Sequence, residues 1–187
     1  MCHFITGIIS GKITIEEINS IGDEFGLQFQ KYSNEFVEKQ LKSDETYIWK
    51  RCKYCDCGTP LGMFKRKDNN QTEETQKAEI AKLKQKGWSE AKIQRLMNDR
   101  NKKAGQEASK FEQSKRSAFH EVQKWGDFIK KLFNSTSIKT FGILLHWYSG
   151  SVNTERITLK ERVMIDKTEL STEHLLEMEE DALLIIS

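Results

Sequence analysis

The sequence predicts an α+β fold in which strands from both chain ends form one mostly antiparallel or mixed sheet, with a basic helical insertion between them. Two observations support this class. Apolar runs of the β type occur at 3–9 and 46–51 and again after residue 139. Between them, about sixty residues contain no proline and are rich in Lys, Glu, Gln and Ala, a composition typical of helices.

The length of 187 residues and the hydrophobic content of 37% are ordinary for a single domain, which needs no crosslinks to bury a core. We expect the sheet core to consist of 1–64 and 135–187 and the helical insert to span 65–134. No internal repeat or long low-complexity tract complicates this division.

The first part of the chain predicts two strands and two helices. The segment 3–9 is a candidate buried strand. Thr14 and Glu17 have the spacing of a capping box, which predicts a helix beginning there. Ser33 is the expected N-cap of a second helix, and 46–51 reads as a strand leading into a cysteine-rich loop.

The middle of the chain predicts helices with two interruptions. Gly87 breaks the pattern and Ser89 restarts it as an N-cap, and a second, weaker break is expected near 101–106. The last helical stretch carries apolar residues at spacings of three, four and seven, which predicts a face directed at the core: Phe111, Ala118, Val122, Trp125, Ile129 and Leu132.

The last part of the chain returns to strands. The nearly continuous apolar run 140–149 predicts a central strand, in which His146 is expected to be a buried and hydrogen-bonded residue. The alternating segment 157–165 predicts another strand, and a short capped helix over 171–178 precedes a terminal strand at 182–186.

Charge is distributed unevenly along the chain. Residues 77–131 carry 15 Lys or Arg and 7 Asp or Glu, a net charge of +8, whereas the chain as a whole has a net charge of +2. A partner with negative charge, either a nucleic acid or an acidic protein surface, would therefore be bound through 77–131.

One segment in this basic region, 83–97, resembles a helix-turn-helix. The pattern is a glycine turn, a capping serine and aliphatic residues that hold two helices together: Leu83, Gly87, Ser89, Ile93 and Leu96. A DNA reader would place Lys92 and Arg95 near the start of its recognition helix and Lys102 and Lys103 on phosphates. A solvated helical hairpin without a nucleic-acid partner gives the same pattern.

Cellular location bears on the chemistry of the four cysteines. No apolar run approaches the ~18 residues of a membrane span, and the first residues lack the basic flank and cleavage site of an export signal. We expect a cytoplasmic protein without membrane association, in which thiols stay reduced. The cysteines then serve metal binding, reactivity or packing.

Three cysteines lie within six positions. Cys52 and Cys55 have the C-x2-C spacing of zinc knuckles, and Cys57 follows at once. A structural zinc ion takes four Cys or His ligands, so Cys2 or His3 would supply the fourth if strand 3–9 lies beside strand 46–51. Neighbouring residues of a strand point to opposite faces, so Cys2 and His3 are alternatives rather than joint ligands.

Two other roles for the cysteines stay open. They can be buried packing residues, or one of them can be a nucleophile. Removal of the initiator methionine would leave Cys2 at the N-terminus, where its own amine can activate the thiol. The start "MCHF" resembles that of the class II glutamine amidotransferases, although His3 replaces the glycine of that family and its later motifs are not found. That resemblance implies a hydrolase or amidotransferase using Cys2. A redox or nucleophilic loop thiol stays open beside it, because the basic neighbours in the loop would lower the pKa of a thiol.

A broader resemblance rests on "MCHFIT", "CDCGTPLG", "GWSEAKI" and "LLHWYSG". Together these segments are similar to a group of small bacterial proteins to which no activity is attached. The resemblance implies nothing about substrate or partner. A zinc-binding protein of the cytoplasm, with a basic helical insert that engages a partner, is therefore the first hypothesis drawn from the residues themselves.

Overall fold

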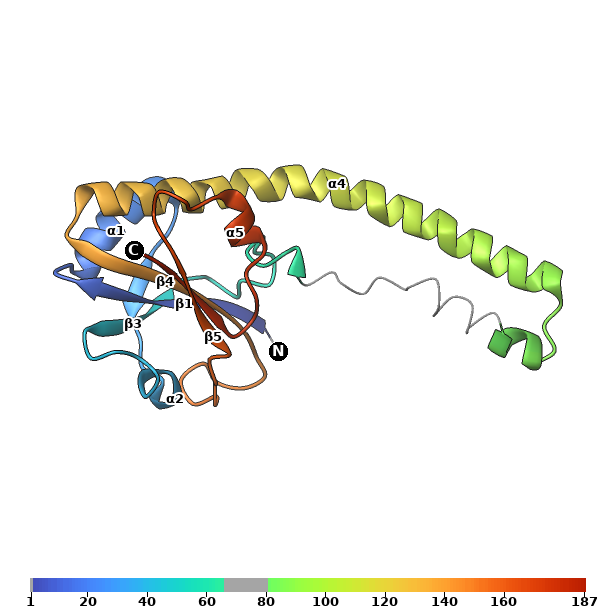
Figure 1. The fold of residues 1–187 in the computed structure, drawn as a ribbon, viewed down its shortest axis with the longest axis horizontal. Helices are drawn as coiled ribbons and strands as arrows, with labels where there is room; N and C mark the ends of the chain where they lie inside the picture. The colour runs from blue at the N-terminus through green and yellow to red at the C-terminus, as the bar shows by residue number, and fades with distance from the viewer. Residues whose placement is uncertain (1, 66–80) are drawn as a thin grey trace. The chain divides into compact units, whose positions relative to one another are not determined.

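The computed structural model describes residues 2–65 and 81–187, and within helix α4 the side chains of residues 100–116 fall outside this description. The described residues contain one six-stranded sheet in the order β2-β3-β1-β4-β6-β5. All neighbouring strands are antiparallel except β5 and β6, which are parallel. The predicted α+β class, with one mixed sheet built from both chain ends, is therefore confirmed (Figure 1). The strands are β1 (Cys2–Gly11), β2 (Phe29–Lys31), β3 (Glu45–Lys50), β4 (Ile138–Tyr148), β5 (Glu161–Ile165) and β6 (Ala182–Ile186).

The short α-helices α1, α2 and α5 begin at side-chain caps. The structure has α1 (Ile15–Gly22), a 3₁₀ turn (Asp23–Phe25), α2 (Glu35–Glu38) and α5 (Thr172–Leu176). The capping box of Thr14 and Glu17 is present at α1, as predicted. Asn34, and not Ser33, caps α2, because the Asn34 side-chain oxygen accepts from two backbone N–H groups of the helix. The Asn34 amide also donates to two backbone carbonyls of a later loop, so this residue joins distant parts of the chain.

Helix α4 (Glu90–Ser135) is continuous, so the break predicted near 101–106 is absent. A glycine inside a helix costs only about 1 kcal/mol relative to alanine, and Gly105 is accommodated without interruption. The break at Gly87 does occur: this residue has φ of +77°, and the Ser89 hydroxyl accepts from the backbone N–H of Lys92 at 3.4 Å.

The chain divides into two compact units. One consists of Met1–Arg66 with Phe119–Ser187, and the other of Lys67–Ala118. The C-terminal turns of α4 therefore belong with the sheet, whereas the division drawn from the sequence placed them in the insert 65–134. The reason is their apolar face, which the sheet buries.

One face of the sheet is covered by α1 and the C-terminal turns of α4 (Figure 1). Its centre is aromatic: the rings of Phe29 and Phe128 stack with centroids 5.6 Å apart, and Phe141 meets Phe128 edge-on at the same separation. Trp125 is 3% exposed beside them. This packing explains why a helix of mostly polar composition is held on the sheet.

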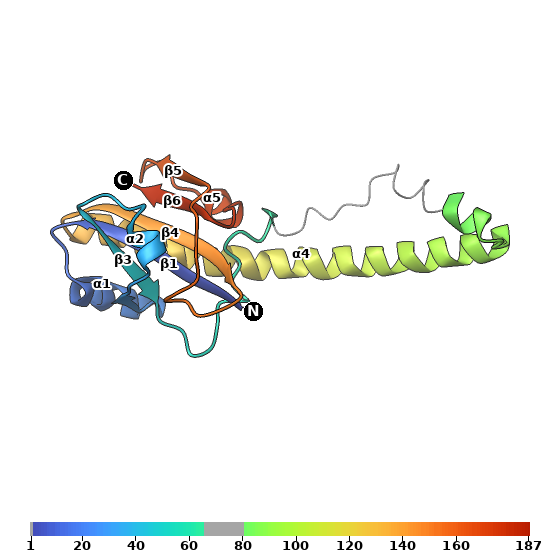
Figure 2. The same ribbon diagram turned by 90° about the horizontal axis from the view of Figure 1, so that it is seen from below.

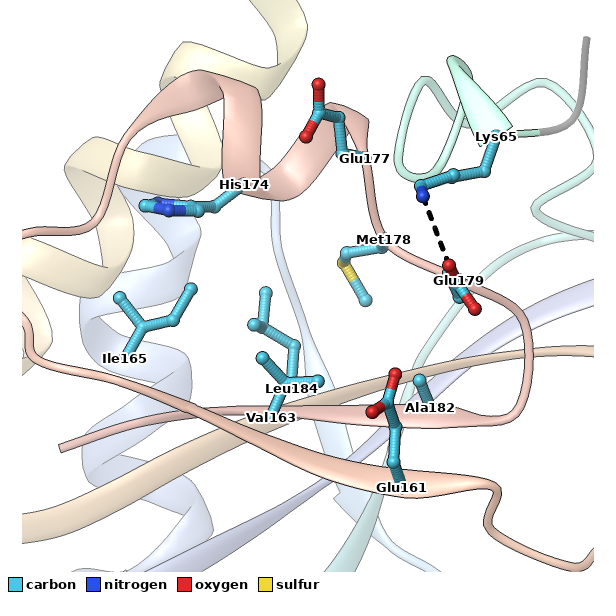
Figure 3. Close-up of a pocket in the computed structure, with 10 residues that line it drawn as sticks. All are labelled: Lys65, Glu161, Val163, Ile165, His174, Glu177, Met178, Glu179, Ala182 and Leu184. Atoms are coloured by element: carbon cyan, nitrogen blue, oxygen red, sulfur yellow. Dashed lines mark ion pairs between the residues drawn. The ribbon is translucent and has the colours of Figure 1, made fainter.

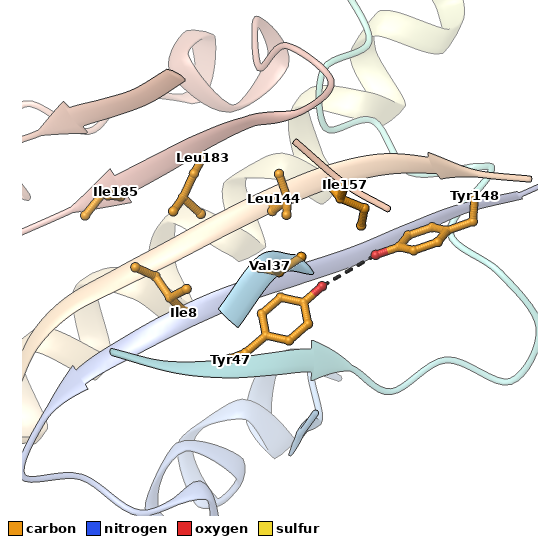
Figure 4. Close-up of a cluster of buried hydrophobic side chains, with 8 residues drawn as sticks. All are labelled: Ile8, Val37, Tyr47, Leu144, Tyr148, Ile157, Leu183 and Ile185. Atoms are coloured by element: carbon orange, nitrogen blue, oxygen red, sulfur yellow. Dashed lines mark hydrogen bonds between the residues drawn. The ribbon is translucent and has the colours of Figure 1, made fainter. Parts of the chain in front are cut away.

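The opposite face carries α2, which lies in front of the sheet in Figure 2. A cluster of buried residues joins the sheet to α2 and to the segment before β5 (Figure 4). Its members are Ile8, Val37, Tyr47, Leu144, Tyr148, Ile157, Leu183 and Ile185. Burial raises the pKa of both tyrosine hydroxyls in this cluster.

The strand predicted over 157–165 is shorter than expected and pairs only over Glu161–Ile165. For the residues just before β5, the side chain of Gln40 supplies the backbone hydrogen bonds that a neighbouring strand would otherwise supply. Its amide donates to the Ile157 carbonyl at 2.8 Å and accepts from the Leu159 N–H at 2.9 Å. These residues thus satisfy their backbone groups while Ile157 enters the cluster under α2.

No helix in the described ranges has both the length and the apolar character to cross a bilayer.

Candidate metal centre

The cysteine loop lies along the first residues of β1, because the antiparallel strand β3 does not extend that far. The last pair between these two strands is Thr6 and Trp49, so the first residues of β1 are left without a partner strand on that side. The loop takes the place of the strand: the Asp56 N–H donates to the His3 carbonyl at 2.8 Å. The start of β1 and the loop after β3 are seen side by side in Figure 2.

The Asp56 side chain fastens the loop. This residue is 6% exposed, and its Oδ2 accepts from the backbone N–H of Ile5 at 3.0 Å. Its Oδ1 pairs with the Lys50 ammonium group at 2.5 Å. A buried carboxylate needs such partners, since an unpaired charge away from water is costly. Asp56 thereby sets the position of the cysteines on either side of it.

Three sulfur atoms converge at this junction. The Sγ atoms of Cys2, Cys55 and Cys57 all lie within 4.8 Å of one another. The backbone N–H of His3 donates to the Cys57 sulfur at 3.3 Å. Tetrahedral zinc with Zn–S bonds of about 2.3 Å sets sulfurs about 3.8 Å apart, so small rotations of these side chains suffice. The group can hold a metal ion, with three protein ligands.

Hydrogen bonds within the group favour negative charge on one sulfur. The pKa of the Cys55 thiol is lowered, first by the backbone N–H of Cys57 and then by the Cys57 and Cys2 side chains. The pKa of Cys2 is raised, because its thiol proton is shared with the sulfurs of Cys55 and Cys57. A backbone N–H aimed at a sulfur stabilises a thiolate, the form that ligates metals.

Cys52, expected to pair with Cys55 through the C-x2-C spacing, is not a member of this group. Burial raises its pKa to about 11, and the negative charge of Asp56 adds to the effect. Cys52 therefore lies against the Asp56 carboxylate as a protonated thiol. The reason is the loop direction, which places Cys55 and Cys57 toward Cys2 and leaves Cys52 beside the end of β3.

His3 is not part of the sulfur group either. It is 4% exposed, and its Nε2 forms an ion-pair contact with the Glu180 carboxylate. Its ring packs edge-on against Trp147, with centroids 4.3 Å apart. Strand alternation sends the side chains of Cys2 and His3 to opposite faces, and the structure assigns the sulfur side to Cys2.

The basic residues expected on nucleic acid are only partly described. Lys92 and Arg95 lie exposed near the start of α4, and the Lys92 ammonium sits 3.9 Å from the centre of the Trp88 ring. Lys102 and Lys103 also lie on α4, with side chains outside the described ones.

His146, predicted to be buried and hydrogen-bonded, is half-buried and lies at the centre of a second polar cluster, whose acidic members Asp181 and Glu155 the sequence did not indicate. The Nδ1 of His146 lies 2.5 Å from Asp181, and its Nε2 lies 3.7 Å from Glu155. Asp181 has φ of +65°, a left-handed conformation that aspartate tolerates better than most residues. Burial opposes ionisation of Glu155, but donors from the Ser149 hydroxyl and two backbone N–H groups outweigh it and lower its pKa to about 2.

No family model matches this chain, and neither a curated protein nor a solved structure matches it.

Proposed function

We propose that the protein binds one zinc ion through Cys2, Cys55 and Cys57, and that the ion joins the first strand to the loop after β3. The observation that carries this proposal is the approach of three sulfurs to within 4.8 Å of one another across more than fifty residues of sequence. Free thiols that merely pack have no need to meet in this way.

Zinc fits the chemistry of the ligands better than a hard cation. Thiolates are soft ligands that favour zinc and related metals, whereas Mg²⁺ and Ca²⁺ take oxygen ligands. Three cysteines leave one of the four zinc positions for water or another ligand from solution. All four cysteines are free, which suits the reducing cytoplasm.

The decisive experiment is metal analysis of protein purified without a chelator. We expect about one zinc per chain in the wild type. Cys55→Ser should lose most of the metal, and Cys52→Ser should keep it, since Cys52 is outside the sulfur group. Loss of zinc from both variants alike, or a metal-free wild type that takes up no zinc or cobalt on addition, would refute the proposal.

The lowered pKa of Cys55 supports a second candidate, an enzyme with a cysteine nucleophile. While Met1 precedes it, Cys2 is the weaker candidate, because its hydrogen bonds to the Cys55 and Cys57 side chains raise the pKa of its thiol. Iodoacetamide labelling separates the candidates. A nucleophile predicts rapid modification of Cys55 in protein as purified, whereas a bound zinc ion predicts protection that is lost when the metal is removed by a chelator.

A further inference from the structure

A cavity of about 210 Å³ lies between the outer strands of the sheet and α5, away from the cysteines (Figure 3). Its floor is apolar and consists of Val163, Ile165, Met178, Ala182 and Leu184. Strand β5 contributes alternate residues to it, as expected for one face of a strand. Pockets for small molecules commonly measure about 300–1,000 Å³, so this one suits a single long side chain better than a whole ligand.

Among the described residues, strand β5 is an edge of the sheet and pairs only with β6. Its outer edge therefore has backbone N–H and C=O groups without a neighbouring strand. Two apolar side chains on this edge strand are exposed to solvent, Val163 at 36% and Met164 at 59%. Exposed edges are sites at which extended segments of other proteins add as an extra strand.

The rim of the cavity has an excess of negative charge. Glu161, Glu177 and Glu179 line it together with one cation, Lys65, which pairs with Glu179 at 3.1 Å. The cation just before β5, Lys160, donates to the Glu180 backbone carbonyl at 2.8 Å and lies 3.6 Å from the Asp181 carboxylate. Glu161 on β5 and Glu177 just after α5 thus add negative charge on two different sides of the apolar cavity (Figure 3).

His174 closes the opposite end of the cavity (Figure 3). Its Nδ1 accepts from the backbone N–H of Ser171 in the capping box of α5, which leaves Nε2 as a donor. This ring is held by the helix cap and adds no negative charge. The cationic end of an occupant is therefore directed toward Glu161 on the strand side.

We propose that the edge of β5 and this cavity bind an extended segment of a partner protein by strand addition, with a lysine or arginine side chain of that segment in the cavity. A strand added beside β5 places every second side chain on the face that carries Glu161, Val163 and Ile165. The aliphatic stem of the basic side chain packs on the apolar floor while its charged end is directed to Glu161, and Glu177 adds negative charge from the α5 side. This binding site contains none of the cysteines, so it stands apart from the zinc proposal.

The test uses a fluorescein-labelled, end-blocked nine-residue peptide in which serine and valine alternate around one central lysine. Binding to the full chain is followed by fluorescence anisotropy, and the site by backbone amide shifts of ¹⁵N-labelled protein. We expect saturable binding, shifts at β5, and a loss of about 10-fold in affinity when the central lysine is replaced by glutamate. In the double variant Glu161→Gln/Glu177→Gln, the affinity for the lysine peptide should fall by about 10-fold. The affinity for the glutamate peptide should stay the same or rise.

Two N-methylated peptides test strand addition itself, since methylation of alternate N–H groups blocks one edge of the peptide. Only one of the two methylation patterns should abolish binding, because the other blocks the edge turned away from β5. Three results overturn the proposal. These are equal binding of the two N-methylated peptides, equal binding of the lysine and glutamate peptides, and no binding of the lysine peptide. Equal competition by butylamine would reassign the cavity to small cations, and self-association of the chain through β5 would reassign the edge to a second copy.

Discussion

Replacement of Asp56 should weaken both the fold and the metal centre, because this one carboxylate joins the cysteine loop to β1. Asp56→Ala leaves the Lys50 ammonium and the Ile5 N–H without their partner. Breaking a buried ion pair costs about 3–5 kcal/mol. Lys50 retains 17% side-chain exposure, so it can reach water and the lower end of that range applies. The unpaired N–H adds about 1–3 kcal/mol, which gives about 4–6 kcal/mol in total.

Asp56→Asn is the gentler variant, because an amide oxygen can still accept from Ile5. With that oxygen toward the Ile5 N–H, the amide NH2 faces the Lys50 ammonium and the ion pair is lost, so we expect a destabilisation of about 3 kcal/mol, the ion-pair part of the loss in Asp56→Ala. Misplacement of the flanking cysteines should also lower zinc affinity by about 10–100-fold, the usual effect of removing a group that orients metal ligands. Urea unfolding of the zinc-free protein measures the first effect, and competition with a chromophoric chelator measures the second.

Asp44→Asn is the matched control, since Asp44 is exposed before β3, and it should change stability by no more than about 0.5 kcal/mol. If Asp56→Ala fails to fold, Asp56→Asn still decides the matter. Wild-type stability together with wild-type zinc affinity in Asp56→Asn would show that the carboxylate does not position the cysteines.

Three other measurements probe separate parts of the chain. Gly7→Ala places a Cβ 2.0 Å from the backbone oxygen of Gly142, so we expect a loss of about 3 kcal/mol or more in thermal unfolding. Gly126→Ala, with open space around the new methyl group in α4, should instead stabilise by about 0.4–1 kcal/mol, and a reversed order would contradict the packing described. Glu155 has a depressed folded pKa of about 2, so its contribution to stability is present above pH ~4.5 and disappears as pH falls toward 2. Glu155→Gln should flatten that part of the curve of stability against pH, and an unchanged slope would exclude Glu155 as its source. Finally, the pKa of about 11 predicts that Cys52 is alkylated slowly at neutral pH and faster as pH rises, which mass spectrometry of labelled peptides can follow.

Much of the secondary structure could be predicted because its causes are local. The capping box at Thr14 and the apolar run of β4 each lie within a few neighbouring residues, so periodicity and spacing were sufficient. The N-cap of α2 was misplaced by one residue because Ser33 and Asn34 are both good caps by type. Only the contacts of Asn34 with a loop more than one hundred residues away distinguish them.

The sequence by itself determined that thiols cluster after β3 and that both chain ends supply strands. It did not determine which cysteines meet: C-x2-C spacing pointed to Cys52 and Cys55, whereas the tertiary structure joins Cys55 and Cys57 to Cys2. That choice depends on how Asp56 binds the backbone of β1, a contact between residues 51 positions apart. Spacing describes which atoms a short segment can bring together, but the direction in which a loop faces is decided by whatever it packs against, and that partner exists only once the sheet has formed.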